Sequence, residues 1–247
     1  MDATRRGAEI NHRHRSSASR HREPVGRPLA FDGLRNGAAA LVPEVATSDS
    51  FYVRWCKPVI DRLCASVLLL LTLPLILVVA FTVLLTLGRP VLYRQRRVGQ
   101  GGGVFRVWKF RTMLPDRRIA ERPVDVDRRV CHKREDDPRH TRVGTVLRRW
   151  RLDELPQLVN IIAGSMSLVG PRPELVEVVS RYQPWQHQRH AVKPGITGPW
   201  QVSAPGCSGL MHENTHIDLA YVGDVGLRTD IGILVRTVRC LLARSGR

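Results

Sequence analysis

Two adjacent carboxylates, Asp153 and Glu154, are the residues of this sequence whose types and spacing best suit chemistry. The residues just before them are strongly basic, with arginines at Arg148, Arg149 and Arg151. Acids beside arginines can hold a divalent cation and a phosphate together, because Mg²⁺ takes oxygen ligands and guanidinium groups bind phosphate through two parallel hydrogen bonds. An exposed helix cap with surface ion pairs has the same spacing, so the rest of the chain must decide between the two.

A helix start would give Asp153 a specific chemical role. Pro156 is tolerated in a first helical turn and Gly164 favours a stop, which predicts a helix to about Ala163 with Asp153 as its N-cap. The positive end of a helix favours negative charge. Asp153 could therefore attack a phosphorus atom and form an acyl phosphate there. Glu154 could supply an oxygen ligand to Mg²⁺, which bridges phosphates and screens their charge.

Three further cations are candidates for binding a diphosphate. Arg148 lies five residues before Asp153, and Arg172 lies in the rigid turn Gly170-Pro-Arg-Pro-Glu. Both offer guanidinium groups that fit phosphate oxygens. The third candidate, Lys109, belongs to a predicted β-hairpin.

The hairpin is predicted from two β-prone segments, 90–98 and 104–113, which flank a glycine-rich turn. Strand alternation puts Lys109 and Arg111 on one face together with Phe105 and Val107. The glycines precede no helix with a phosphate-loop pattern, so a hairpin turn is the better interpretation.

The run from Leu63 to Leu87 is apolar and uncharged, which predicts a membrane helix. A straight helix of this length would be about 37 Å long, and a bilayer core is about 30 Å thick. Pro74 predicts a kink, where Thr72 could satisfy a freed backbone carbonyl. Basic residues flank both ends, which favours placing both flanks in the cytoplasm. A re-entrant helix satisfies both observations, and a single crossing is the open alternative.

The composition of the chain limits the kinds of partner and the cellular compartment that fit this protein. The formal charge of +17 favours polyanionic partners such as phosphate esters or anionic lipid. The five cysteines are scattered without a CxxC pair, so reduced thiols facing a cytoplasm are expected. The sequence predicts three parts: a disordered basic tail over residues 1–52, a re-entrant membrane helix over 53–89, and a cytoplasmic catalytic domain over 90–247.

The expected fold class is α+β and mainly helical, with a re-entrant proline-broken helix, a small β-hairpin and amphipathic interfacial helices. A helix is expected over about 174–182, and a last one over about 230–242. Arg236 and Arg239 lie among the apolar positions of the last helix, as in a helix that lies on a membrane. Packing on the domain core is the alternative for that helix.

Two other functions have weaker support in the sequence. His212 and His216 match the HExxH pattern of zinc hydrolases, but the loop-like stretch upstream gives little helical context. Nucleic-acid binding would fit the charge, yet no recognised binding motif is present and the basic residues cluster beside the apolar run.

Five segments together resemble the bacterial sugar transferases, which are monotopic polyprenyl-phosphate sugar-1-phosphate transferases. They occur in that family's order: Pro90-Val-Leu-Tyr-Arg-Gln-Arg-Arg-Val-Gly, Lys109-Phe-Arg-Thr-Met, Leu152-Asp-Glu-Leu-Pro-Gln-Leu, Met166-Ser-Leu-Val-Gly-Pro-Arg-Pro-Glu and Lys193-Pro-Gly-Ile-Thr-Gly. The resemblance covers about residues 57–242, and five ordered motifs are far more specific than any one of them.

The resemblance implies transfer of a sugar-1-phosphate from a UDP-sugar to undecaprenyl phosphate, which would initiate exopolysaccharide or other surface glycan synthesis. It implies Asp153 as the nucleophile of a two-step covalent mechanism and Glu154 as the residue associated with Mg²⁺. It also implies an enzyme on the cytoplasmic face of the bacterial inner membrane. The substrate-binding residues expected on this basis are Lys109, Arg111, Arg148, Arg172, Lys193 and Asp218.

The chain departs from the family pattern at two places. The membrane helix breaks at Leu73-Pro74, where the family has Ser-Pro, and Gly198-Pro-Trp-Gln replaces Gly-Trp-Ala-Gln. The expected partners are a UDP-sugar, undecaprenyl phosphate and membrane lipid, without nucleic acid. The sugar and the oligomeric state do not follow from the sequence. The alternative function is a membrane-tethered basic protein that binds anionic lipid or nucleic acid without turnover.

Overall fold

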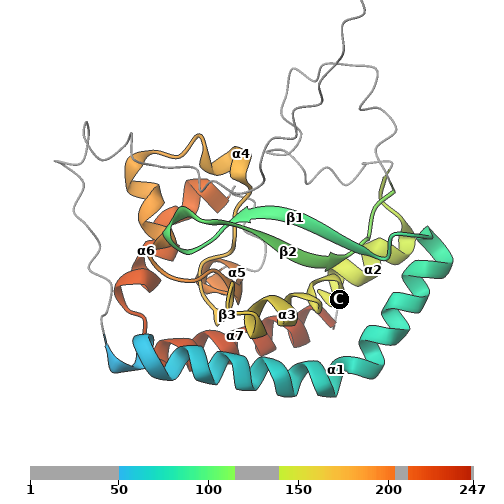
Figure 1. Ribbon diagram of the computed structural model, residues 1–247, viewed down its shortest axis with the longest axis horizontal. Helices are drawn as coiled ribbons and strands as arrows, with labels where there is room; N and C mark the ends of the chain where they lie inside the picture. The colour runs from blue at the N-terminus through green and yellow to red at the C-terminus, as the bar shows by residue number, and fades with distance from the viewer. Residues whose placement is uncertain (1–49, 115–138, 204–210, 246–247) are drawn as a thin grey trace, which may run out of the picture. The chain divides into compact units, whose positions relative to one another are not determined.

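The computed structural model describes residues 50–114, 139–203 and 211–245, all of which belong to the compact unit Phe31–Arg247. The predicted basic tail therefore lies almost wholly outside the described residues. The principal elements in chain order are α1 (Lys57–Leu87), β1 (Leu92–Val98), β2 (Val104–Phe110), α2 (Arg142–Arg149), α3 (Gln157–Ile162), β3 (Ser167–Val169), α4 (Val176–Val179), β4 (Gly195–Thr197), α5 (Pro199–Ser203), α6 (Thr215–Gly223) and α7 (Leu227–Ser245). The described part is mainly helical with a small antiparallel hairpin, as predicted (Figure 1).

The helix α1 follows a π-helical turn, Tyr52–Cys56, and bends along its course (Figure 1). Tyr52–Leu87 is long and apolar enough to cross a membrane, and 11% of its most apolar window is buried. Pro74 lies inside α1, and proline is the common cause of a sharp bend. Thr72 was expected to satisfy the carbonyl freed at the kink. Its hydroxyl instead donates to the Leu68 carbonyl at 2.6 Å. The carbonyl that Pro74 leaves free, because proline has no N–H, is that of Leu70.

The strands β1 and β2 form the predicted antiparallel hairpin, in which Tyr93 lies opposite Lys109. Asn160 of α3 holds β2 by two hydrogen bonds: its Oδ1 accepts from the Trp108 N–H at 3.0 Å, and its Nδ2 donates to the Arg106 carbonyl at 2.8 Å. A side-chain amide thus pairs with the edge of β2 as a neighbouring strand would. The hairpin is thereby fixed to the helix that follows Asp153 and Glu154.

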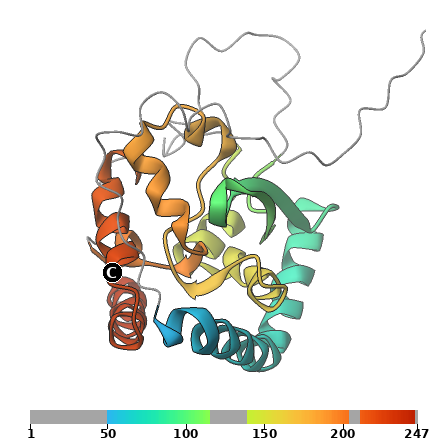
Figure 2. The same cartoon turned by 60° about the vertical axis from the view of Figure 1, so that its left-hand side comes forward.

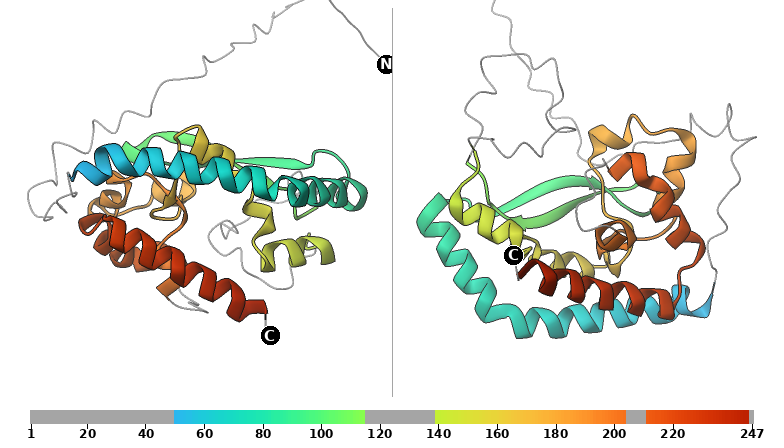
Figure 3. Two further views of the ribbon diagram at one scale, coloured as in Figure 1. Left: turned by 90° about the horizontal axis from the view of Figure 1, so that it is seen from below. Right: turned by 180° about the vertical axis from the view of Figure 1, so that it is seen from behind.

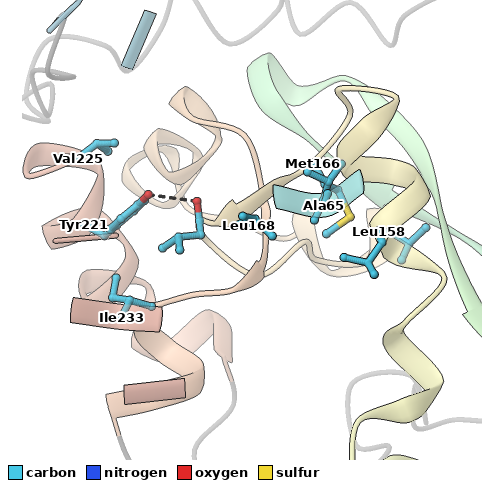
Figure 4. Close-up of a cluster of buried hydrophobic side chains, with 10 residues drawn as sticks. Ala65, Leu158, Met166, Leu168, Tyr221, Val225 and Ile233 are labelled. Carbon is cyan, nitrogen blue, oxygen red and sulfur yellow. Dashed lines mark hydrogen bonds between the residues drawn. The ribbon is translucent and has the colours of Figure 1, made fainter. Parts of the chain in front are cut away.

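The main core gathers apolar side chains from α1, β2, α3, β3, α6 and α7 (Figure 4). Its members include Ala65 of α1 and Ile161 of α3, neither of which is exposed. The one proton of the Tyr221 hydroxyl is shared between the Val169 carbonyl, 3.1 Å away and drawn as the dashed line in Figure 4, and Asp230 Oδ1, 2.7 Å away. The helix α1 contributes Ala65 and the partly buried Leu69 to this cluster, which is where it packs on the rest of the unit.

The strands β3 and β4 pair in parallel and bring two proline-rich turns side by side. A Cβ atom added to Gly170 would lie 2.3 Å from the Lys193 carbonyl oxygen, and one added to Gly195 would lie 2.2 Å from the Gly170 nitrogen. Glycine at both positions is what allows this approach. The sequence predicted the two turns but not the strands that pair them.

Two predicted helices have different bounds in the structure. The helix expected over 174–182 is reduced to α4, because Val98 donates to the Glu174 carbonyl at 3.0 Å and Leu175 bridges Arg97. These bonds hold residues 174 and 175 extended against the hairpin. The last helix is longer than expected. It lies with the N-terminal part of α1 on one side of the unit (Figure 2), and both face the viewer in the left view of Figure 3.

Candidate active site

Asp153 lies in the 3₁₀ turn Leu152–Glu154, directly before α3. The prediction that it caps an α-helix is wrong, since α3 begins at Gln157 with Pro156 at its N-cap. The difference arises because Arg151 adopts left-handed backbone geometry (φ 55°), which turns the chain before the two acids. Asp153 is 8% exposed.

Burial raises the pKa of the Asp153 carboxyl to about 6, and the negative charge of Glu154 adds to the shift. Lys109, Arg172 and a hydrogen bond from its own backbone N–H oppose it. A carboxylate in this state has the basicity expected of an activated nucleophile, and it is still mostly ionised at neutral pH.

Glu154 is the centre of an ion-pair cluster beside Asp153. Its Oε1 accepts hydrogen bonds from Lys109 Nζ and from Arg172 Nη2, each at 2.8 Å. Arg151 Nη1 lies 3.8 Å from the other oxygen, Oε2. Burial would raise the pKa of Glu154, but the charges and hydrogen bonds of Arg172 and Lys109 outweigh it and hold that pKa well below its ordinary value. Glu154 is therefore ionised at any physiological pH.

The two cations at Oε1 come from different parts of the fold. Lys109 comes from β2, and burial lowers its pKa while Glu154 opposes that shift. Arg172 follows β3, and the charge of Glu154 raises its pKa against the effect of burial. The structure thus brings four predicted site residues together: Asp153, Glu154, Lys109 and Arg172.

Behind Arg172 lies a buried ion pair. Arg189 Nη2 donates to Asp218 Oδ2 at 2.5 Å and to the Arg172 carbonyl at 2.9 Å. Both Arg189 (1% exposed) and Asp218 (0%) are enclosed. The pair fixes the backbone of the turn that presents the Arg172 guanidinium. Asp218, predicted to bind substrate, contacts this turn through Arg189.

The other predicted substrate-binding residues lie in different surroundings. Arg111 donates to the backbone carbonyls of Leu87, Gly88 and Arg89, so it caps the C-terminal end of α1. Arg148 Nη1 donates to the Thr112 hydroxyl at 3.2 Å.

The amine of Lys193 lies on the α1 side of the unit. Burial lowers its pKa, as does the charge of Arg62, and Asp61 opposes the shift. Substrate binding by Arg111, Arg148, Lys193 and Asp218 stays a prediction.

Arg97 was not among the predicted site residues, although it lies in one of the quoted motifs. Its guanidinium donates to the Pro173 carbonyl at 3.1 Å and lies 3.6 Å from Glu174 Oε1. Burial lowers its pKa to about 10, and the neighbouring charge of Arg172 contributes. Strand alternation could have found it, because Arg97 shares the hairpin face of Lys109 through the register.

The donor atoms present fit Mg²⁺ that is shared with a substrate. Within the described residues, no group of three or more His, Cys, Asp and Glu side chains could hold a metal ion by itself. Mg²⁺ is commonly held by one or two carboxylates together with substrate phosphates and water. Both short contacts to Glu154 end on Oε1, so Oε2 is the oxygen suited to such sharing.

The HExxH segment of the zinc alternative does not lie in one continuous α-helix. Its first three residues lie in the 3₁₀ helix Met211–Asn214, and α6 begins at Thr215. His216 lies on α6, whereas the side chain of His212 is outside the described residues. A zinc pair needs both histidines on one face of a continuous α-helix.

Residues 52–244 match the family model described as bacterial sugar transferase. The chain is 37% identical over 162 residues to the "Galactosyl transferase CpsE" of Streptococcus agalactiae serotype III, covering 64% of this chain and 36% of that protein. It is 37% identical over 207 residues to the "UDP-glucose:undecaprenyl-phosphate glucose-1-phosphate transferase" of Escherichia coli K12, covering 80% and 42%. It is 38% identical over 194 residues to the "Exopolysaccharide production protein ExoY" of Rhizobium meliloti, covering 75% and 85%. The chain thus spans less than half the length of the first two relatives.

Proposed function

Because this chain belongs to the bacterial sugar transferase family, we propose that it transfers a sugar-1-phosphate from a UDP-sugar to undecaprenyl phosphate, initiating exopolysaccharide or other surface glycan synthesis. The observation that carries the proposal is the buried Asp153 carboxylate, set beside a glutamate that is held in place by a cation from β2 and a cation from the turn after β3. Names of relatives that act on UDP-glucose and undecaprenyl phosphate support the substrate class.

The reaction proceeds in two displacements at one phosphorus atom. An Asp153 oxygen attacks the phosphorus that carries the sugar, an O–P bond forms, and the bond to the second phosphate breaks, releasing UMP. An oxygen of undecaprenyl phosphate then attacks the same phosphorus and displaces Asp153, which returns as a carboxylate. With a pKa of about 6, roughly nine-tenths of Asp153 is ionised at pH 7 and ready to attack.

Lys109 and Arg172 bind and orient the diphosphate. Their charges are already held at the site by Glu154, so little reorganisation is needed when phosphate oxygens arrive. Arg189 and Asp218 keep the turn of Arg172 in place through its backbone carbonyl. Mg²⁺ on Glu154 would neutralise charge on the leaving phosphate.

The enzyme works at the inner membrane, with its catalytic part on the cytoplasmic side. The long apolar α1, bent and flanked by arginines at both ends, supports a re-entrant segment that enters and leaves on one side. The alternative function is binding of anionic lipid or nucleic acid without turnover. It would not require Asp153 and Glu154 to have different roles.

The test is a comparison of Asp153→Asn with wild type in membranes supplied with a UDP-sugar and undecaprenyl phosphate. The variant should release no UMP and form no covalent sugar-phosphate adduct detectable by mass spectrometry of the intact protein. Arg149→Gln, which removes an exposed charge four residues away, is the control and should keep activity. Full activity in Asp153→Asn would refute the mechanism, and a wild type that binds lipid without turnover would favour the alternative.

A further inference from the structure

One face of the hairpin is directed at the candidate active site. Lys109 extends from this face of β2, and its Nζ lies 2.8 Å from Glu154 Oε1. Arg97 extends from the same face of β1 and donates to the Pro173 carbonyl in the turn after β3. Residues that lie opposite each other on paired strands share a face, and Tyr93 lies opposite Lys109. Tyr93 therefore belongs to the face that carries cations of the site.

Tyr93 differs from the other aromatic residues of the hairpin because its ring stays open to solvent. Phe110 is 3% exposed, and Phe105 packs against the main core. Trp108 lies on the opposite face, where the guanidinium carbon of Arg94 lies 3.8 Å from the centre of its ring. Tyr93 is 50% exposed, although it lies on the face that elsewhere packs against the unit. Its ring is therefore accessible to a ligand at the site.

The position of Tyr93 suits the part of a nucleotide that lies next to the phosphates. The Cβ atoms of residues directly opposite on antiparallel strands are about 4.5–5.5 Å apart, so the side chains of Tyr93 and Lys109 leave the hairpin as neighbours. Burial lowers the pKa of Arg97 to about 10, and Glu154 and Tyr93 are among the neighbours that also act on it. In the proposed reaction, Lys109 and Arg172 bind the diphosphate of the donor. Only the ribose separates that diphosphate from uracil, so a base on the Tyr93 ring stays within reach.

Stacking is the interaction that an open aromatic ring offers to a nucleobase. Uracil has two flat faces, and stacking of a base on an aromatic side chain contributes about 1–3 kcal/mol. A tyrosine ring loses little conformational entropy on binding, because only two side-chain torsions become fixed. The cations of the site bind phosphate whatever is attached to it. A base contact is what would add selectivity for a nucleotide.

We propose that Tyr93 binds the uracil ring of the UDP-sugar by stacking, and that this end of β1 forms the nucleoside part of the donor site. The proposal rests on the proposed function, which supplies a uridine nucleotide as the donor. Tyr93 contacts the leaving group and not the reacting atoms. UMP leaves from this side of the phosphorus atom after Asp153 has attacked, and the acceptor phosphate then approaches through the space that UMP has left.

The experiment compares the binding of UMP and of ribose 5-phosphate to the protein in nanodiscs, followed by ligand-observed NMR titration. The two probes share a ribose and a phosphate, and they differ in the base. The ratio of their dissociation constants therefore isolates the contribution of uracil. Wild type should bind UMP more tightly by about 5- to 150-fold, and Tyr93→Leu should bring this ratio toward one. The affinity for ribose 5-phosphate should not change.

Two control variants separate stacking from a general effect on the hairpin. Tyr93→Phe keeps the ring and should keep the ratio. Trp108→Leu removes a ring from the opposite face of the same hairpin and should keep it too. In the enzyme assay, Tyr93→Leu should raise the KM for the UDP-sugar by the factor that the binding ratio loses. Its rate of adduct formation at saturating UDP-sugar should stay at the wild-type value, because the contact exists equally in the ground state and the transition state.

Three results would overturn the proposal. The first is a wild type that binds UMP no more tightly than ribose 5-phosphate. The second is a Tyr93→Leu variant that keeps the wild-type ratio, or that loses affinity for both probes equally. The third is a raised KM for undecaprenyl phosphate with unchanged UMP affinity, which would assign the ring to the acceptor. Failure of the proposed function would be visible differently, as the absence of UMP release and of the covalent adduct in a wild type that still binds UMP.

Discussion

Asp153 and Glu154 are adjacent carboxylates, yet neutralising each should change stability in opposite directions. Burial makes the ionised form of Asp153 unfavourable in the folded protein, whereas Glu154 balances two buried cations. We therefore predict that Asp153→Asn stabilises the catalytic unit at pH 8 and that Glu154→Gln destabilises it. Both substitutions keep the shape of the side chain and remove one charge.

The size of the first effect follows from the pKa of Asp153, which rises from an ordinary 3.8 to about 6. A raised carboxyl pKa means that the folded state holds the proton more tightly than the unfolded state. Stability is therefore greatest at low pH and is lost as the pH rises through about 6. The shift of about two units corresponds to about 3 kcal/mol above pH 7 and to less than about 1 kcal/mol at pH 4. Asp153→Asn removes this penalty.

The second effect has the opposite sign. Without Glu154, the charges of Lys109 and Arg172 lose their partner, and breaking a buried pair costs about 3–5 kcal/mol. The side chains of these cations are 17% and 27% exposed, so solvent screens part of the loss and about 2–3 kcal/mol is expected.

Thermal unfolding followed by tryptophan fluorescence, with the protein in nanodiscs, measures both effects. At pH 8, Asp153→Asn should unfold at a higher temperature than wild type, by up to about 6–12 °C, and the gain should shrink toward zero at pH 4. Glu154→Gln should unfold at a lower temperature at pH 8. A destabilised Asp153→Asn, or a gain that does not change with pH, would show that burial does not govern the Asp153 carboxyl.

Two more outcomes follow from the same geometry. UMP release should fall as the pH drops through about 6, and Lys109→Met should move that midpoint upward, because the Lys109 charge lowers the Asp153 pKa; a pH profile of single-turnover UMP release tests this. Gly170→Ala should lower stability by about 1–3 kcal/mol, since its Cβ would lie 2.3 Å from a backbone oxygen, whereas Gly226→Ala, with nothing within 4 Å, should not. Chemical denaturation compares the two alanine variants, and equal stability would contradict the account of Gly170.

The hairpin could be predicted from the sequence because its signals are local: β-prone residues on both sides of a glycine turn. The pairing of β3 with β4 could not. Each has three residues, too few for alternation to be visible, and their contact joins turns more than twenty residues apart. The length of α4 likewise depends on hydrogen bonds from the hairpin, which local propensity does not include.

The candidate site also has parts that could be predicted from the sequence and parts that could not. Residue chemistry predicted Lys109 and Arg172 as candidates for binding a diphosphate, but it did not predict that both cations would contact Glu154. The surroundings of Arg111 depend instead on where α1 ends, since its guanidinium contacts the last carbonyls of that helix. The turn before Asp153 depends on the backbone of Arg151, and arginine gives no local signal for left-handed geometry.

The close contact between the turns at Gly170 and Gly195 also limits which substitutions this chain can accept. Neither position can gain even a methyl group without a shift of the backbone, so no side chain can be added at that contact. Side chains of a different size or charge can be introduced only in segments that begin where the contact ends. The Pro199-Trp200 pair, which departs from the family pattern at the start of α5, is the first such segment after Gly198, the last glycine of the contact.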